Sequence, residues 1–141
     1  MNIPKTIANI TGQDTFTICS RSRKAEVVDA RKLTCIALFL TGTNTSEATV
    51  KVHLDRTSFY PTKESLYKLI DTDAEMKYHW SLLLKELGEY YRLLSLHELY
   101  RLLGHILTYP DKYICVVADI IMVVIRSRGV ETAPKAHPQI N

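Results

Sequence analysis

The sequence contains little cysteine, and its three cysteines are poorly placed for a disulfide or a metal site. Cys19, Cys35 and Cys115 are odd in number, lie far apart and form no Cys-x-x-Cys pair. This usage is typical of reduced intracellular thiols, with Cys35 and Cys115 as small apolar residues inside hydrophobic runs. The five histidines are scattered, and no cysteine or carboxylate completes a set with zinc-ligand spacing. We therefore expect no metal.

Segments that direct a chain to or through a membrane are also missing. The first residues do not combine a charged start with an apolar region, as a signal peptide does. The longest apolar run, Tyr113 to Ile125, contains Asp119 and is shorter than the roughly 20 residues that span a bilayer. We therefore expect a cytoplasmic protein without membrane contact.

The residue patterns of catalysis and nucleotide binding are absent as well. The sequence contains no Gly-x-x-x-x-Gly-Lys-Ser/Thr loop, which would hold the phosphates of a nucleotide. No nucleophile, base and orienting group can be read from it, and Glu86 and Glu89 most simply form a solvated helix face. We therefore expect a protein that is not an enzyme and that needs no cofactor.

Charge is modest in total but unevenly distributed. The net charge of the 141 residues is +3, and the 46% hydrophobic content is ordinary for a chain with one core. Residues 1–70 carry ten Lys/Arg against six Asp/Glu, whereas residues 71–141 carry eight against nine. The basic half contains Ser20-Arg-Ser-Arg-Lys24, a short loop leading into a helical pattern. Cations gathered in a loop beside a helix are typical of a phosphate-binding surface.

Hydrophobic periodicity predicts an all-α chain. Gly12 is expected to end the first helix in the left-handed conformation, and Ser95 with Glu98 forms a capping-box sequence. Gln13 to Cys19 is expected to be extended loop. A buried strand is the alternative for the Val/Ile-rich segment after Lys112, but its length favours a helix. The expected helices cover residues 3–11, 24–40, 45–53, 55–70, 75–94, 96–107 and 112–126.

Two of these helices form a helix-turn-helix pattern. A short helix after Asn44 is followed, across a tight turn, by a helix that opens with Asp55-Arg-Thr-Ser58. Pro61 would then lie in the first turn, where a missing amide proton costs little. Arg31, which follows the basic loop, is expected to bond loop carbonyls rather than an external partner.

Together these elements resemble the C-terminal DNA-binding domain of the bacterial replication initiator DnaA, a Trp-repressor-like helix-turn-helix. The likeness covers roughly residues 3–78 and is most specific in the basic loop and the start of the next helix. The residues that carry it are Ile7-Ala8, Thr11-Gly12, Ser20-Arg-Ser-Arg-Lys24, Glu26-Val-Val-Asp-Ala-Arg31, Thr41-Gly42, Glu47, Asp55-Arg-Thr-Ser58 and Thr72-Asp73.

The resemblance implies double-stranded DNA as the partner. In the family an arginine of the basic loop enters the minor groove, and Arg23 stands at that position. The start of the family's recognition helix reads the major groove; the residues at that place here are Asp55, Arg56, Thr57 and Ser58. Their chemistry fits, because Asp accepts from cytosine, Arg pairs bidentately with guanine and Thr contacts a thymine methyl. Phosphate contacts that set the register are expected from Arg21, Lys24 and Lys63.

Three features favour an alternative, a protein-interaction or assembly module that keeps the fold without binding DNA: the altered turn, Pro61 and the modest charge. His53-Leu54 replaces the family's glycines before the turn, and Pro61 replaces a helix-friendly residue. Arg56 also replaces a histidine of the family pattern.

The second half of the chain has no counterpart in this resemblance. We expect residues 1–76 to form the DNA-binding domain, residues 77–126 a helical extension and residues 127–141 a flexible tail. The extension carries an aromatic and leucine stripe from Tyr78 to Tyr109. Its helices are expected either to pack on the first half or to pair two copies in a homodimer.

Overall fold

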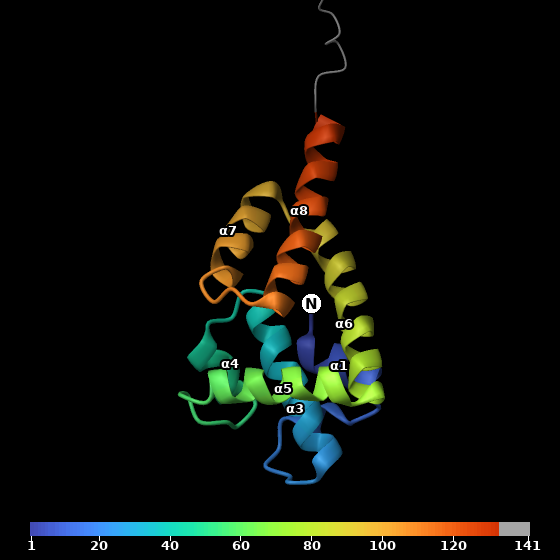
Figure 1. Cartoon of the computed structure of the whole chain (residues 1–141), viewed down its shortest axis with the longest axis vertical. Helices are drawn as coiled ribbons and strands as arrows, with labels where there is room; N and C mark the ends of the chain where they lie inside the picture. Colours follow the sequence, from blue (N-terminus) through green and yellow to red (C-terminus); the bar gives the residue numbers. More distant parts are fainter. Residues whose placement is uncertain (133–141) are drawn as a thin grey trace, which may run out of the picture.

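The computed structural model describes residues 1–132 and is all-helical over that range. The molecule is elongated, with α5 lying across the long axis and α6 and α8 running along it (Figure 1). The helices are α1 (Ile3–Thr11), α2 (Thr15–Ile18), α3 (Ala25–Leu40), α4 (Thr45–Lys51), α5 (Phe59–Thr72), α6 (Ala74–Arg92), α7 (Leu96–Ile106) and α8 (Lys112–Thr132).

Helix α3 is the centre of the fold. Every residue from Leu33 to Leu40 is buried, because α1, α2, α4, α5 and α7 all pack against this helix. A helix that is apolar on all sides is expected to be covered on all sides. Val28, nearer the N-terminal end, is only half-buried, so the burial is complete only in the C-terminal half of the helix.

Most of the predicted helix ends are confirmed by capping bonds. Gly12 ends α1 at φ 79°, Asn44 accepts from the N–H of Glu47 at 2.8 Å, and Ser95 and Glu98 form the reciprocal capping box. One prediction is wrong: residues 15–18 are not extended but form the one-turn helix α2. Asp14 begins it by accepting from the N–H of Thr17.

The extension packs on the first half instead of standing apart from it. Helix α6 contacts α1 and α5, and the predicted boundary at residue 76 lies inside α6. Two side chains of the extension bond the last carbonyls of α3: the Tyr91 hydroxyl donates to the Leu40 carbonyl at 2.7 Å, and His105 Nε2 donates to the Phe39 carbonyl at 2.9 Å. These carbonyls lie where a helix has no internal donors of its own.

A buried ion pair joins α5 to the start of α8. Lys63 Nζ lies 2.9 Å from Asp111 Oδ2, and the Tyr67 hydroxyl donates to the same carboxylate. Asp111 also accepts from the backbone N–H groups of Tyr113 and Ile114, and so caps α8. Partial burial alone would raise the pKa of Asp111, but the bonds from Ile114, Lys63 and Tyr67 together hold it below its ordinary value.

The C-terminal predictions are confirmed only in part. The segment after Lys112 is a helix, not a strand, and it continues to Thr132, so residues 127–132 are helical instead of tail. The remainder of the predicted tail, 133–141, lies outside the described residues. Cys35 is buried, which raises the pKa of its thiol to about 12, whereas Cys115, the other cysteine inside an apolar run, is exposed. No helix within residues 1–132 is long and apolar enough to cross a bilayer.

Removal of Asp111 should destabilise the protein more than removal of Lys63. Asp111→Ala leaves the Lys63 ammonium, 5% exposed, without its counter-charge and removes the cap of α8, so we expect a loss of about 3 kcal/mol. Lys63→Met keeps apolar packing and leaves Asp111 its other donors, so we expect a loss of about 1 kcal/mol or less. Urea unfolding measures both, and equal losses would contradict this account of the pair.

The same carboxylate should make stability depend on acid. Because the pKa of Asp111 is lower in the folded state than its ordinary value of 3.8, its contribution is complete above that value and is lost as the pH falls through the folded-state pKa. The free energy of unfolding of Asp111→Asn should therefore fall less steeply in acid than that of the wild type. Parallel pH profiles of the two proteins would speak against it.

Candidate nucleic-acid interface

The basic loop, residues 20–24, is held in place by the buried side chain of Arg31. From the second turn of α3, its Nε donates to the Ile18 carbonyl at 3.1 Å and its Nη2 to the Ser20 carbonyl at 2.6 Å. Arg31 is only 6% exposed, and charge-assisted bonds of this kind are stronger than neutral ones. The structure thus confirms the prediction that Arg31 bonds loop carbonyls.

Two serines shape the loop between its cations. Ser20 Oγ donates to the Thr17 carbonyl at 2.6 Å and accepts from the N–H of Ser22 at 3.1 Å. Ser22 Oγ accepts in turn from the N–H of Lys24 at 3.3 Å. Both serines are half-buried, so they hold the backbone while the residues between and after them face solvent.

The three cations of the loop are exposed and carry no partner. Arg21, Arg23 and Lys24 form no ion pair or side-chain hydrogen bond within residues 1–132. In particular, the Arg23 guanidinium is not buried against a carboxylate. An ordered loop with unpaired outward cations is a surface on which an anion would meet little competition.

The turn between α4 and α5, residues 52–58, begins with a left-handed histidine. His53 has φ 60°, the only positive φ of a residue other than glycine in the part of the chain that the structure describes. The N–H of Leu54 bonds the Thr49 carbonyl at 2.9 Å and that of His53 bonds the Val50 carbonyl at 3.0 Å. This is the Schellman ending of a helix, in which glycine normally takes the position that His53 occupies.

The second part of this turn is closed by Asp55. Its Oδ1 accepts from the N–H of Thr57 at 3.0 Å and from the Thr57 hydroxyl at 2.9 Å, and its carbonyl accepts from Ser58. The bonds from Thr57 hold the pKa of Asp55 below its ordinary value. Arg56 is exposed at the tip and has no ion pair within 1–132.

The prediction that Asp55-Arg-Thr-Ser58 starts a helix is therefore wrong. Helix α5 begins at Phe59, and Ser58 caps it through its backbone alone. Pro61 does lie in the first turn, as predicted, ahead of the first internal bond from the N–H of Thr62 to the Ser58 carbonyl. Because Pro61 has no amide proton, a helix that started one turn earlier would lack the backbone bond to the Thr57 carbonyl. The polar residues close a turn instead.

Lys63 does not fit the prediction of a phosphate contact. Its side chain is buried and paired with Asp111, and its Nζ also lies 5.0 Å from the centre of the Tyr60 ring. The correction could not be foreseen locally, because the two partners are 48 residues apart in the sequence. The exposed side chains of the first two turns of α5 are Tyr60, Pro61 and Glu64, so this surface contributes no cation.

The remaining predicted residues gather toward one end of the molecule. In Figure 1 the basic loop forms the end of the long axis opposite the last turns of α8, and the turn before α5 lies toward that same end. Between them, Lys32 of α3 donates to the Ser65 hydroxyl of α5 at 2.8 Å and so ties the two helices together.

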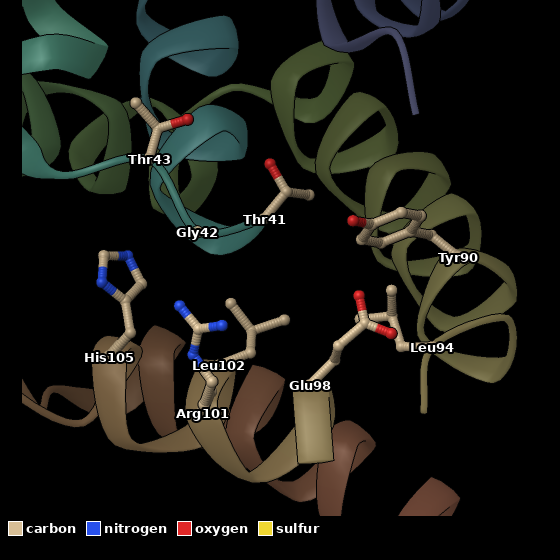
Figure 2. A pocket seen from close by; sticks show the side chains of 9 residues that line it. All are labelled: Thr41, Gly42, Thr43, Tyr90, Leu94, Glu98, Arg101, Leu102 and His105. Carbon is tan, nitrogen blue, oxygen red and sulfur yellow. The ribbon is translucent and has the colours of Figure 1, made fainter. Parts of the chain in front are cut away.

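A separate cleft lies between α7 and the turn after α3 (Figure 2). It measures about 350 Å³, and Arg101 and Glu98 of α7 face the Thr41–Thr43 turn across it. Several of its polar groups already have structural partners: His105 bonds Phe39, Glu98 bonds the N–H of Ser95, and Thr41 bonds its own helix. We read it as the seam by which α7 docks on α3.

Within residues 1–132 no group of three or more His, Cys, Asp or Glu side chains could hold a metal ion. Compared with known protein families, characterised proteins and solved structures, the chain matches none.

Loss of the Arg31 anchor should loosen the basic loop. Arg31→Met leaves two carbonyls in a largely buried site without a donor, so the free energy of unfolding should fall by about 2–3 kcal/mol. Arg31→Lys can bond one of them and should fall by less, while Arg23→Met on the exposed loop should change stability by under about 0.5 kcal/mol. Thermal and urea unfolding compare the three variants; equal losses for Arg31→Met and Arg23→Met would refute the anchoring.

Glycine at position 53 should stabilise the protein. His53→Gly relieves a left-handed conformation that costs a residue with a Cβ about 1–2 kcal/mol, so we expect a gain of up to about 1 kcal/mol after the greater freedom of the unfolded chain is included. Val50→Gly, three residues earlier and inside α4, should lower stability and serves as the control. A loss at both positions in urea unfolding would show that His53 makes a contact of its own.

Proposed function

We propose that this protein binds double-stranded DNA without catalysing a reaction on it. The observation that carries the proposal is the ordered basic loop, whose three unpaired cations project from a backbone that Arg31 holds in place. A fixed loop loses little conformational freedom on binding, so more of the attraction to phosphate remains as affinity.

The order of elements supports duplex DNA over another polyanion. The basic loop, the long helix α3, the short helix α4, the turn and α5 follow one another as in the DnaA-type domain that the sequence resembles. In this proposal Arg23 enters the minor groove, and Arg21 and Lys24 contact phosphates. The turn at residues 55–58 faces the major groove, and Arg56 at its tip reads guanine.

The turn, and not the helix start, is the reading element in this proposal. Asp55 Oδ1 is engaged by Thr57, which leaves Oδ2 to accept from a cytosine amine. The Thr57 hydroxyl donates to Asp55, so its methyl is the part left for a thymine. Ser58 is half-buried and bonds the Asp55 carbonyl, so we assign it to shaping the turn.

A second candidate, a protein-interaction module, is favoured by the composition of α5. The exposed surface of its first two turns carries an aromatic ring, a proline and a carboxylate where a DNA-reading helix usually carries polar and basic residues. The burial of Lys63 removes the one cation of these turns from solvent. A titration with duplex DNA at several salt concentrations separates the two candidates.

Fluorescence anisotropy of mixed-sequence duplexes, titrated at several salt concentrations, tests the proposal. With about four cations near phosphate, log affinity should fall with log salt with a slope of about −3 to −4. Arg23→Ala and Arg56→Ala should each weaken binding several-fold, and Arg21→Ala or Lys24→Ala, which removes a phosphate contact, should flatten the slope by about 1. Lys85→Ala removes an equally exposed cation from α6 and should change neither quantity.

Two results would count against DNA binding. One is the absence of salt-sensitive affinity; the other is an equal effect of Arg23→Ala, Arg56→Ala and Lys85→Ala, which would indicate attraction by net charge alone. Either result, from a protein whose circular dichroism is unchanged, would favour the interaction module.

A further inference from the structure

The outer face of α8 alternates exposed valines with charged side chains and is uncovered within residues 1–132. Val116 and Val123 are 45% and 60% exposed, and Asp119 and Arg126 between and after them are exposed as well. Successive spacings of three, four and three place these four side chains on one face of the helix. The other side of α8 packs on α6 and α7 and contains Ile114, Val117 and Ile121.

This face has the pattern of a helix-pairing seam. The three-four spacing is that of the core positions of a coiled coil, where β-branched valine is common. In addition, the last turns of α8 extend beyond the ends of α6 and α7 (Figure 1).

The charges on the face identify the partner. Asp119 and Arg126 are seven residues apart, about 10 Å along the helix, which is too far for them to pair with each other. Neither forms an ion pair or hydrogen bond with another described residue. They lie at nearly equal distances on either side of a point beside Val123, one acidic and one basic. Such a face is complementary to itself when it is turned around.

We propose that two copies of this chain pack α8 against α8 in antiparallel orientation. A two-fold axis near Val123 brings Asp119 of each copy opposite Arg126 of the other. In a two-fold contact each residue pair occurs twice, so two ion pairs form. The Val123 side chains of the two copies lie between these ion pairs, at the centre of the contact. This contact does not depend on DNA binding and can be tested in its absence.

Charge reversal tests the antiparallel pairing. Analytical ultracentrifugation of the full chain over a concentration series should show a monomer–dimer equilibrium. Asp119→Arg places an arginine opposite Arg126 of the other copy, and Arg126→Asp places an aspartate opposite Asp119 of the other copy. Each contact then contains two like charges, so either change should weaken dimerisation by on the order of tenfold or more. The double variant Asp119→Arg with Arg126→Asp reverses both partners and should bring the dimerisation constant back near that of the wild type.

A control and clear failures complete the experiment. Lys85→Asp reverses an exposed charge on α6 and should leave dimerisation unchanged. Both residues of the pair are exposed, so the variants should keep the helical circular dichroism of the wild type. A wild type that stays monomeric at the highest concentration reached, single reversals without effect, or a double variant no better than the single ones would each overturn the proposal.

Discussion

The structure depends on the burial of the C-terminal half of α3. A helix surrounded by others gains much from its apolar side chains, but its ends still hold polar backbone groups that water cannot reach. At its C-terminal end, Tyr91 and His105 donate to the Leu40 and Phe39 carbonyls, so the extension is needed to complete the helix of the first half. Near its N-terminal end the buried Arg31 side chain also needs hydrogen-bond partners, and it donates to the Ile18 and Ser20 carbonyls of the preceding segment.

This constraint explains why the basic loop is ordered although it lies at the surface. Its carbonyls satisfy a guanidinium that burial would otherwise leave unpaired, and its serines bond successive backbone groups. The three cations of the loop, Arg21, Arg23 and Lys24, therefore do not need to contribute to stability. Residues that are free of structural duty can be selected for a partner, which is the physical basis for proposing that Arg21, Arg23 and Lys24 bind one.

The sequence was sufficient wherever structure is decided locally. Asn44 and Ser95 cap the starts of their helices and Gly12 caps the end of its helix, as predicted, because each acts within a few residues of its own position. Arg31 was also readable, since a cation one turn inside an apolar helix needs oxygen partners close by. Asp14 gave a local signal for α2 that the periodicity argument passed over, because a single turn is too short to show a period.

Where distant residues decide, the sequence was not sufficient. The burial of Lys63 follows from Asp111, and nothing near Lys63 indicates that partner. The start of α5 was misplaced for a different reason: Asp55 and Ser58 are good caps for a helix and good residues for a turn, and only the three-dimensional path after His53 chooses between the two. The exposure of Cys115 likewise depends on which face of α8 meets α6. The mostly apolar sequence of this helix does not reveal that face.

The two proposed surfaces constrain each other. In Figure 1 α8 runs along the long axis, and its last turns lie at the end opposite the basic loop. An antiparallel pair of α8 helices would therefore direct the two basic loops away from each other. Helix-turn-helix dimers that read adjacent half-sites instead place both reading elements on one side, about one helical turn of DNA apart. If both surfaces function, the dimer would hold two separate duplex segments, and bridging of two DNA molecules, not binding to a palindrome, would be its signature.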